Sequence, residues 1–202
     1  MVIGLTGGIA CGKTTISKVL HELGAEIIDV DSLGHQLIKD EPLVYNKIID
    51  RFGRGILDDK GEIDRSKLGV IVFNNQSDLK SLNEIVHPLL IELTKKKIGS
   101  SKGKMVVVDA ALLIELNLTS MVGHVILVSA NEDTQLKRLL ERGLSKEDAL
   151  KRIRSQMSSK EKERFADFVI YNNGELEDAI RQVKLVWNNL LCLNHCQADS
   201  KV

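Results

Sequence analysis

The fold is decided by one stretch near the start of the chain, Val2-Ile3-Gly4-Leu5-Thr6-Gly7-Gly8-Ile9-Ala10-Cys11-Gly12-Lys13-Thr14-Thr15. Its residues 7–14 fit the pattern G-x-x-x-x-G-K-[ST], in which a glycine-rich loop joins a strand to a helix and binds phosphate. An apolar run precedes the loop and apolar residues at helical spacing follow it, so the required context is present. The pattern predicts a nucleoside triphosphate site; the alternative is a glycine-rich turn before an ordinary helix.

A loop of this kind binds its ligand mainly through the backbone. Glycines permit close approach, and successive N–H groups converge on phosphate oxygens at the positive end of the following helix. Lys13 would reach the β- and γ-phosphates, and the Thr14 hydroxyl would ligate Mg²⁺. The candidate nucleotide-binding residues of this stretch are Gly8, Ile9, Ala10, Cys11, Gly12, Lys13, Thr14 and Thr15.

The composition narrows the class of protein. The 202 residues are enough for one large domain or a core with insertions. The formal net charge is zero, so no overall basic field indicates nucleic acid. Three cysteines are too few for a disulfide framework, and we find neither a membrane span nor a signal peptide. We expect a cytoplasmic protein without an obligatory protein partner.

Hydrophobic periodicity predicts an α/β protein with a parallel sheet. The helix after the loop is expected to end at Gly24, and residues 25–31 read as a second strand. Near-continuous apolar runs at 105–109 and 125–129 are typical of parallel strands covered on both faces. Residues 168–171 favour a last strand, which an amphipathic helix follows.

Between these strands the chain is expected to be helical. Within the helical part, Pro88 is expected to kink or break a helix. The expected divisions are a nucleotide-binding core of residues 1–31, 104–140 and 165–193, a helical acceptor-binding insertion at 32–103, a lid at 141–164 and a frayed tail at 194–202.

Two carboxylates, Asp29 and Asp31, end the second predicted strand. Side chains two apart in a strand share a face, so both would point the same way beside the loop. One could accept the proton of an attacking hydroxyl while the other helps hold Mg²⁺. The alternative is that Asp31 only caps the next helix and Asp29 is a solvated strand end.

Further charged residues are candidates for the same site. Asp109 follows an apolar run, the pattern of a second magnesium-site element, although acidic strand ends are common. Arg138, Arg142, Arg152 and Arg154 could neutralise the transferring phosphoryl group as part of a lid, or could simply form a solvated helical face.

Two residues of the helical insertion are weaker candidates. His87 stands alone before a proline, a setting in which histidine is more often packed or capping than catalytic. Arg65 is a candidate only if a phosphate of the substrate lies nearby.

With these residues placed, the sequence resembles the dephospho-coenzyme A kinases over nearly its whole length. The similar segments are Gly4 to Thr15, Ile28-Asp29-Val30-Asp31, Ile63 to Gly69 with Phe73, Leu82 to Ile85 with His87-Pro88, Val108 to Glu115, Gln135 to Arg142, Arg152-Ile153 with Gln156, and Ala166 to Gly174. The loop by itself is generic to many NTPases, whereas the ordered set is specific.

Three departures from the family's usual residues are visible. Ala10-Cys11 stands where Gly-Ser is common, Ala111 replaces a proline, and Tyr171 stands where Asp is frequent. Because the backbone does most of the phosphate binding, we expect the loop to tolerate Ala10-Cys11 in place of Gly-Ser. We also expect Cys11 to make the loop sensitive to thiol reagents.

The resemblance implies a three-layer parallel-sheet P-loop kinase core with a helical acceptor-binding insertion and a helical lid. It implies ATP-dependent, Mg²⁺-assisted phosphorylation of the ribose 3′-hydroxyl of dephospho-coenzyme A. The implied roles are Asp31 as base with Lys13 and Arg138 in catalysis; Arg142, Asn172 and Gly174 beside the loop in ATP binding; Asp31, Arg65, His87 and Leu112 in acceptor binding; and Thr14, Asp29 and Asp109 at the metal.

Other functions remain possible from the residues. A nucleoside or nucleotide kinase would have the same fold and a smaller acceptor. A regulatory GTPase would need an Asn-Lys-x-Asp type motif, and we find none. A nucleotide-dependent adaptor without catalysis would leave Asp31 without a role.

Overall fold

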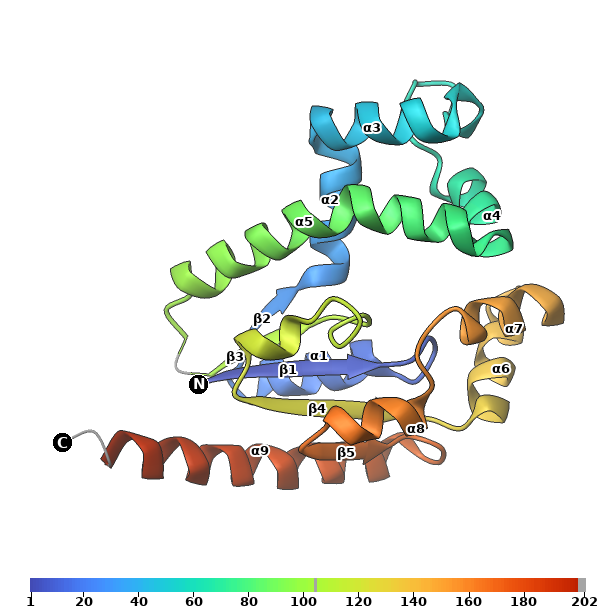
Figure 1. Cartoon of the computed structure of the whole chain (residues 1–202). Helices are drawn as coiled ribbons and strands as arrows, with labels where there is room; N and C mark the ends of the chain where they lie inside the picture. Colours follow the sequence, from blue (N-terminus) through green and yellow to red (C-terminus); the bar gives the residue numbers. More distant parts are fainter. Residues whose placement is uncertain (104, 200–202) are drawn as a thin grey trace. The chain divides into compact units, whose positions relative to one another are not determined.

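The computed structural model describes residues 1–103 and 105–199, with side chains as far as residue 194. It divides into two compact units. The first contains Met1–Ile28 together with the chain from Ser100 onward, and the second contains Asp29–Gly99. Figure 1 traces the elements of both along the chain.

The first unit is built on a five-stranded sheet of order β2-β3-β1-β4-β5. The strands are β1 (Val2–Gly7), β2 (Glu26–Asp29), β3 (Val106–Asp109), β4 (His124–Ser129) and β5 (Phe168–Tyr171). β1 pairs in parallel with β3 and β4, and β4 pairs in parallel with β5. The predicted α/β class with a parallel sheet is confirmed, and the phosphate-loop sequence follows the central strand.

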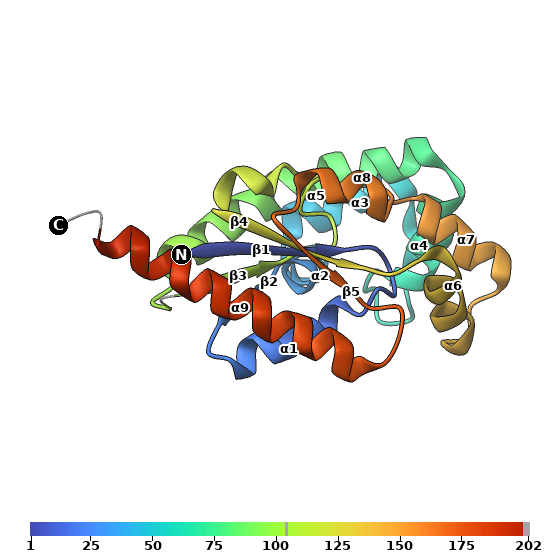
Figure 2. The same cartoon turned by 90° about the horizontal axis from the view of Figure 1, so that it is seen from below.

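Two helices, α1 (Lys13–Glu22) and α9 (Leu176–Asp199), pack side by side against one face of the sheet (Figure 2). The core between helices and sheet includes Ile16 of α1, Trp187 of α9 and Ile126 of β4, all buried. α9 continues to Asp199, so it contains residues 194–199 of the segment expected to fray. The remaining residues of that segment, 200–202, lie outside the described part of the chain.

The other face of the sheet and its carboxyl end are covered by shorter elements. A Cβ at Gly4 of β1 would lie 2.6 Å from Leu113, so the turn after β3 packs directly on this strand. These elements are the 3₁₀ helix η2 (Leu118–Met121), helices α6 (Glu132–Glu141), α7 (Lys146–Arg154) and α8 (Ser159–Lys162), and the 3₁₀ helix η3 (Glu163–Phe165). Ser145 caps α7 by accepting the N–H of Asp148.

The second unit is helical and has its own apolar core, which includes Ile48, Ile56 and Val72. Its elements are α2 (Val30–Asp40), α3 (Pro42–Phe52), η1 (Arg54–Ile56), α4 (Arg65–Asn74) and α5 (Gln76–Ser100). Asp64 caps α4 by accepting the N–H groups of Ser66 and Lys67. Pro88 was expected to kink or break a helix, and α5 continues through it, so the break does not occur: packing of the helix outweighs one missing hydrogen bond. Within the described residues, none of the helices has the length and apolarity needed to span a bilayer.

Candidate active site

The loop between β1 and α1 adopts a conformation that depends on its small residues. Ala10 has φ 57° and Gly12 has φ 96°, both in the left-handed region. A Cβ at Gly7 would lie 2.5 Å from the Cys11 sulfur and 2.6 Å from a strand carbonyl oxygen. The N–H of Cys11 donates to the carbonyl oxygen of Gly8 (3.2 Å) and closes the turn. The glycines therefore fix a compact turn directly at the N-terminus of a helix.

The carbonyl oxygens of this turn are held by side chains from distant parts of the sequence. Gln135, Arg138 and Asn172 donate to the carbonyl oxygens of residues 9, 10 and 11, in that order, at 2.7, 3.1 and 2.8 Å. Because these three carbonyl oxygens are already hydrogen-bonded to side chains, the backbone N–H groups of the turn can be directed at an anion. Gln135 and Asn172 are buried, so these contacts are sheltered from water.

Arg138 has a structural contact that the sequence did not predict. Besides the bond to residue 10, its guanidinium donates to the carbonyl oxygen of Asn172 (3.0 Å) and so ties the loop to the end of β5. The predicted part of Arg138 in catalysis stays a prediction. Gln135 received no role from the sequence; its position one turn before Arg138 on α6 is the signal that could have indicated one.

Lys13 and Asp109 form an ion pair at the carboxyl end of the sheet. They meet because β1 and β3 are neighbouring parallel strands, with Leu5 opposite Asp109. Their side chains are only 13% and 7% exposed. To bind a phosphate, the Lys13 ammonium would exchange the Asp109 carboxylate oxygen for a phosphate oxygen.

The oxygen ligands near this ion pair suit Mg²⁺, which prefers hard oxygen donors and keeps several waters and phosphate oxygens in its shell. Thr14 follows Lys13 and is exposed at the start of α1, and Asp109 supplies a carboxylate. No group of three or more His, Cys, Asp or Glu side chains able to hold a metal occurs in the described part of the chain. The residues therefore fit a metal that one or two protein ligands share with a triphosphate.

The other predicted residues of the first unit lie on several of its elements. Arg142 is exposed at the end of α6 and donates its N–H to the carbonyl oxygen of Leu139 (3.1 Å). Leu112 is half-buried in the turn after β3, and Gly174 is exposed in the turn before α9. Thr15 is half-buried in the first turn of α1. Their predicted ligand contacts stay predictions.

Cys11 is buried and not poised for reaction. It is 1% exposed, and burial raises the pKa of its thiol above the ordinary 9.0, although Lys13 opposes the shift. Since the thiolate is the reactive form, the burial of Cys11 and the raised pKa argue against the expected sensitivity of the loop to thiol reagents. The reason is packing, because the side chain points into the core under the loop.

We therefore expect Cys11 to be inert to dithionitrobenzoate in the folded protein. The Cys192→Ser, Cys196→Ser double variant leaves Cys11 as the only thiol of the chain. This variant should release no thiol signal over minutes at about pH 7.5 and a full equivalent after denaturation. Cys192 is exposed and serves as the reactive comparison in the wild type. Rapid modification of the native double variant would contradict the packing argument.

Asp29 and Asp31 do not share a strand, so the predicted strand through residue 31 is wrong at its end. β2 ends at Asp29 and α2 begins at Val30. Asp29 is the N-cap of that helix: its carboxylate accepts the N–H (2.9 Å) and the hydroxyl (2.6 Å) of Ser32. Asp31 lies in the first turn, where the helix dipole favours a negative charge. The alternative interpretation, in which Asp31 only caps the next helix, is also wrong about the residue, because Asp29 is the cap.

Arg65, which begins α4, reaches across the second unit to α2. Its guanidinium donates to Nε2 of His35 (2.6 Å), which must therefore be the unprotonated nitrogen of a neutral ring. Partial burial and the Arg65 charge hold the pKa of His35 below the ordinary 6.5, although the Asp31 and Asp29 carboxylates oppose the shift. His35 was missed by the sequence reasoning; its spacing of four from Asp31 on one helix could have indicated it.

His87 lies half-buried on α5, and burial holds its pKa below the ordinary 6.5. The unfolded chain therefore binds a proton below pH 6.5 that the folded ring does not bind. The free energy of unfolding should therefore fall as the pH drops below 6.5, and it should level off once the pH is below the pKa of His87 in the folded protein. We expect His87→Leu to reduce this loss in denaturant midpoints measured between about pH 7.5 and 5. An unchanged pH dependence would argue against His87 as a source.

Parallel strands with a phosphate loop after the central strand, and a lysine paired to the carboxylate of the neighbouring strand, define a P-loop nucleotide-binding protein of the kinase type. A likeness of fold alone extends to the shikimate kinase from Acinetobacter baumannii, with a TM-score of 0.54 at 18% identity over 95% of this chain and 93% of that one.

Closer relatives identify the family. The family model described as Dephospho-CoA kinase matches residues 1–178. The dephospho-CoA kinase of Carboxydothermus hydrogenoformans is 46% identical over 186 residues, 90% of each chain. The structure of the dephospho-CoA kinase from Campylobacter jejuni is similar at 30% identity, with a TM-score of 0.65 over 94% of this chain and 96% of that one. The chain belongs to the dephospho-CoA kinase family.

Proposed function

We propose that this chain transfers the γ-phosphoryl group of ATP to the ribose 3′-hydroxyl of dephospho-coenzyme A, giving coenzyme A and ADP. The match of residues 1–178 to the family carries this proposal. The phosphate loop supports its ATP half, because three side chains already hold the loop's carbonyl oxygens and Lys13 is in place at its end.

In the proposed reaction the acceptor oxygen attacks the γ-phosphorus and the bond from that phosphorus to the β,γ-bridging oxygen breaks. The hydroxyl proton passes to the Asp31 carboxylate, and ADP leaves with the electron pair of the broken bond. Lys13 and the N–H groups of the loop would hold the β- and γ-phosphates in line for attack. Asp31 is a half-buried carboxylate in the first turn of α2, and a carboxylate oxygen can accept the proton of a hydroxyl that lies within hydrogen-bond distance.

Mg²⁺ would be held by Thr14 and Asp109, with Asp29 further out. When bound, it supplies neutralisation of the charge on the β- and γ-phosphate oxygens. Asp29 would serve through its outward lone pairs, since its carboxylate already accepts two bonds from Ser32. Arg142, Asn172 and Gly174 would complete the ATP site, and Arg65, His87 and Leu112 the acceptor site. A cytoplasmic location and activity without a protein partner also belong to this proposal.

The test is a panel of acceptors incubated with Mg-ATP and followed by ADP release and by phosphorus NMR of the product. The panel contains dephospho-coenzyme A, adenosine, pantetheine phosphate and common nucleosides. We expect turnover with dephospho-coenzyme A and a new phosphomonoester on its ribose. Preferential phosphorylation of a free nucleoside would overturn the proposal.

A further inference from the structure

The segment from Ser155 to Lys162, here called the strap, ends in a lysine with no access to solvent. The Lys162 side chain is 0% exposed, although lysine is among the residues least often fully buried. A buried ammonium is costly unless it is paired and hydrogen-bonded. The groups that pair with the Lys162 ammonium therefore matter to its role in the fold.

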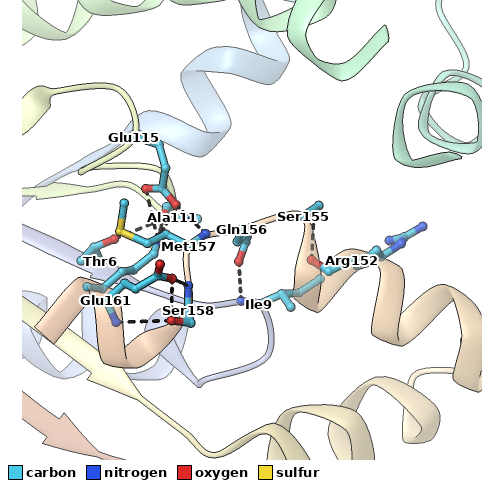
Figure 3. A network of polar contacts seen from close by, with 11 residues as sticks. Thr6, Ile9, Ala111, Glu115, Arg152, Ser155, Gln156, Met157, Ser158 and Glu161 are labelled. Carbon is cyan, nitrogen blue, oxygen red and sulfur yellow. Dashed lines mark hydrogen bonds and ion pairs between the residues drawn. The ribbon is translucent and has the colours of Figure 1, made fainter. Parts of the chain in front are cut away.

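Lys162 is bound by the segment that follows β3. Its ammonium donates to the carbonyl oxygen of Ala111 (2.6 Å) and pairs with the Glu115 carboxylate (3.0 Å), whose side chain is 23% exposed. The same carbonyl oxygen accepts the hydroxyl of Thr6, in the strand that leads into the phosphate loop (3.1 Å). Glu115 also accepts the N–H of Met157 (3.3 Å). Figure 3 shows Glu115 above this part of the strap, with Met157 and Ala111 beside it.

The middle of the strap is a rigid turn. The Ser158 hydroxyl accepts the N–H of Glu161 (3.3 Å), and the Glu161 carboxylate accepts the N–H of Ser158 (3.0 Å), a complete capping box. The Ser158 hydroxyl also donates to the Glu161 carboxylate (2.6 Å) and holds the pKa of this group below its ordinary value. The turn therefore transmits the position of Lys162 to the residues before it.

The residue positioned in this way is Gln156. Its side-chain oxygen accepts the N–H of Ile9 in the phosphate loop (2.8 Å; Figure 3). Gln135 donates to the carbonyl oxygen of the same residue (2.7 Å), so Ile9 is held on both sides of its backbone. Gly8 and Gln156 also line a cavity of about 420 Å³ beside the loop.

We propose that the Glu115–Lys162 pair is a positioning anchor, which seats Gln156 on the Ile9 N–H and thereby holds the phosphate loop in its triphosphate-binding shape. Neither charged residue needs to touch the ligand; both act through Gln156. The inference rests on the proposed function only for the identity of the nucleotide, because it concerns ATP affinity and not the acceptor.

The test measures the dissociation constant for Mg-ATP by calorimetry without an acceptor, so a wrong acceptor assignment leaves its outcome intact. Gln156→Met removes the bond to Ile9 at similar volume. We expect its dissociation constant to rise about threefold to tenfold, as for one lost hydrogen bond. With any acceptor that turns over, KM for ATP should rise while kcat changes less. An unchanged dissociation constant for Mg-ATP in Gln156→Met would overturn the proposal. Tighter binding by this variant would also overturn it, because it would show that Gln156 competes with the triphosphate.

Glu115→Gln tests the anchor itself. It keeps the shape of the side chain but removes the charge that pairs with Lys162, and it should weaken ATP binding about as much as Gln156→Met. The double variant should bind no more weakly than Gln156→Met alone, because both changes act on one contact. Additive effects, or a lower Tm with unchanged ATP affinity, would make the pair merely structural and overturn the anchor.

Two further variants keep this test decisive. If Glu115→Gln does not fold, Glu115→Leu with Lys162→Met removes both charges together, a change that buried pairs often tolerate. It should weaken ATP binding in the same way. The matched control is Glu26→Gln, because Glu26 also accepts a backbone N–H from another segment, that of Gly103 (2.8 Å), at the start of β2. ATP affinity should be unchanged in this control.

Discussion

Asp31→Asn is expected to lower kcat by about 10²- to 10⁴-fold, the usual contribution of a positioned general base. Asparagine matches the shape of the carboxylate but cannot accept the proton of the attacking hydroxyl. Affinity for ATP should remain within about twofold of the wild type, because the loop and Lys13 bind the triphosphate through other atoms. Rapid-quench turnover with dephospho-coenzyme A and calorimetry with Mg-ATP measure the two quantities.

Asp40→Asn is the matched control for Asp31→Asn. Asp40 is the last residue of the same helix and is exposed, so removing its charge should leave kcat unchanged. Phosphoryl transfer at the wild-type rate by Asp31→Asn would remove Asp31 from its proposed place as the base. A loss of both ATP binding and turnover would show a structural effect instead.

Gly12→Ala is expected to disable ATP binding and to destabilise the first unit. A Cβ there would lie 2.1 Å from the side-chain nitrogen of Asn172, which supports the loop, and Gly12 has φ 96°. The left-handed backbone costs about 1–2 kcal/mol for a residue with a Cβ, and the clash adds a cost of the order of 1–3 kcal/mol. The dissociation constant for ATP should rise more than about tenfold as loop N–H groups lose alignment.

Gly24→Ala separates the two causes of this effect. Gly24 has φ 101°, yet nothing lies within 4 Å of the position its Cβ would take. Gly24→Ala should lower the free energy of unfolding, measured with denaturant, by only the backbone cost of about 1–2 kcal/mol. Its affinity for ATP should be unchanged. If Gly12→Ala and Gly24→Ala behaved alike, the contact with Asn172 would be irrelevant to the loop.

The sequence predicted the parts of the fold that depend on local pattern. The apolar run, the glycines and the lysine of the opening stretch indicate a strand, a turn and a helix, and all three are present at β1, the loop and α1. The apolar runs ending at Asp109 and Ser129 are the buried parallel strands β3 and β4. Continuous apolar runs are reliable here because both faces of a parallel sheet are covered.

What the sequence did not predict depends on contacts between distant residues. Asp29 and Asp31 read as one strand because apolar residues continue to Val30, whereas the hydrogen bonds that Asp29 accepts from Ser32 start the helix at Val30, two residues earlier than predicted. The burial of Lys162 was not predicted either. Its neighbours in the sequence give no sign that this lysine is buried, because its partners Glu115 and Ala111 lie far away along the chain. The hydrogen bonds from residues 135, 138 and 172 to the loop carbonyl oxygens were likewise not predicted, since partners over a hundred positions away leave no periodic signal; the spacing of Gln135 and Arg138 on one helix is the local hint.

The way the loop is held has a consequence for how this family can diverge. Its carbonyl oxygens are fixed by Gln135, Arg138 and Asn172, and the Cys11 side chain turns into the core. Ala-Cys can therefore replace Gly-Ser at residues 10 and 11 with little effect on the anion site, whereas the left-handed φ of Ala10 and the burial of Cys11 still exclude large side chains there. Substitution should also be resisted at the three supporting positions, which a motif confined to the loop does not include.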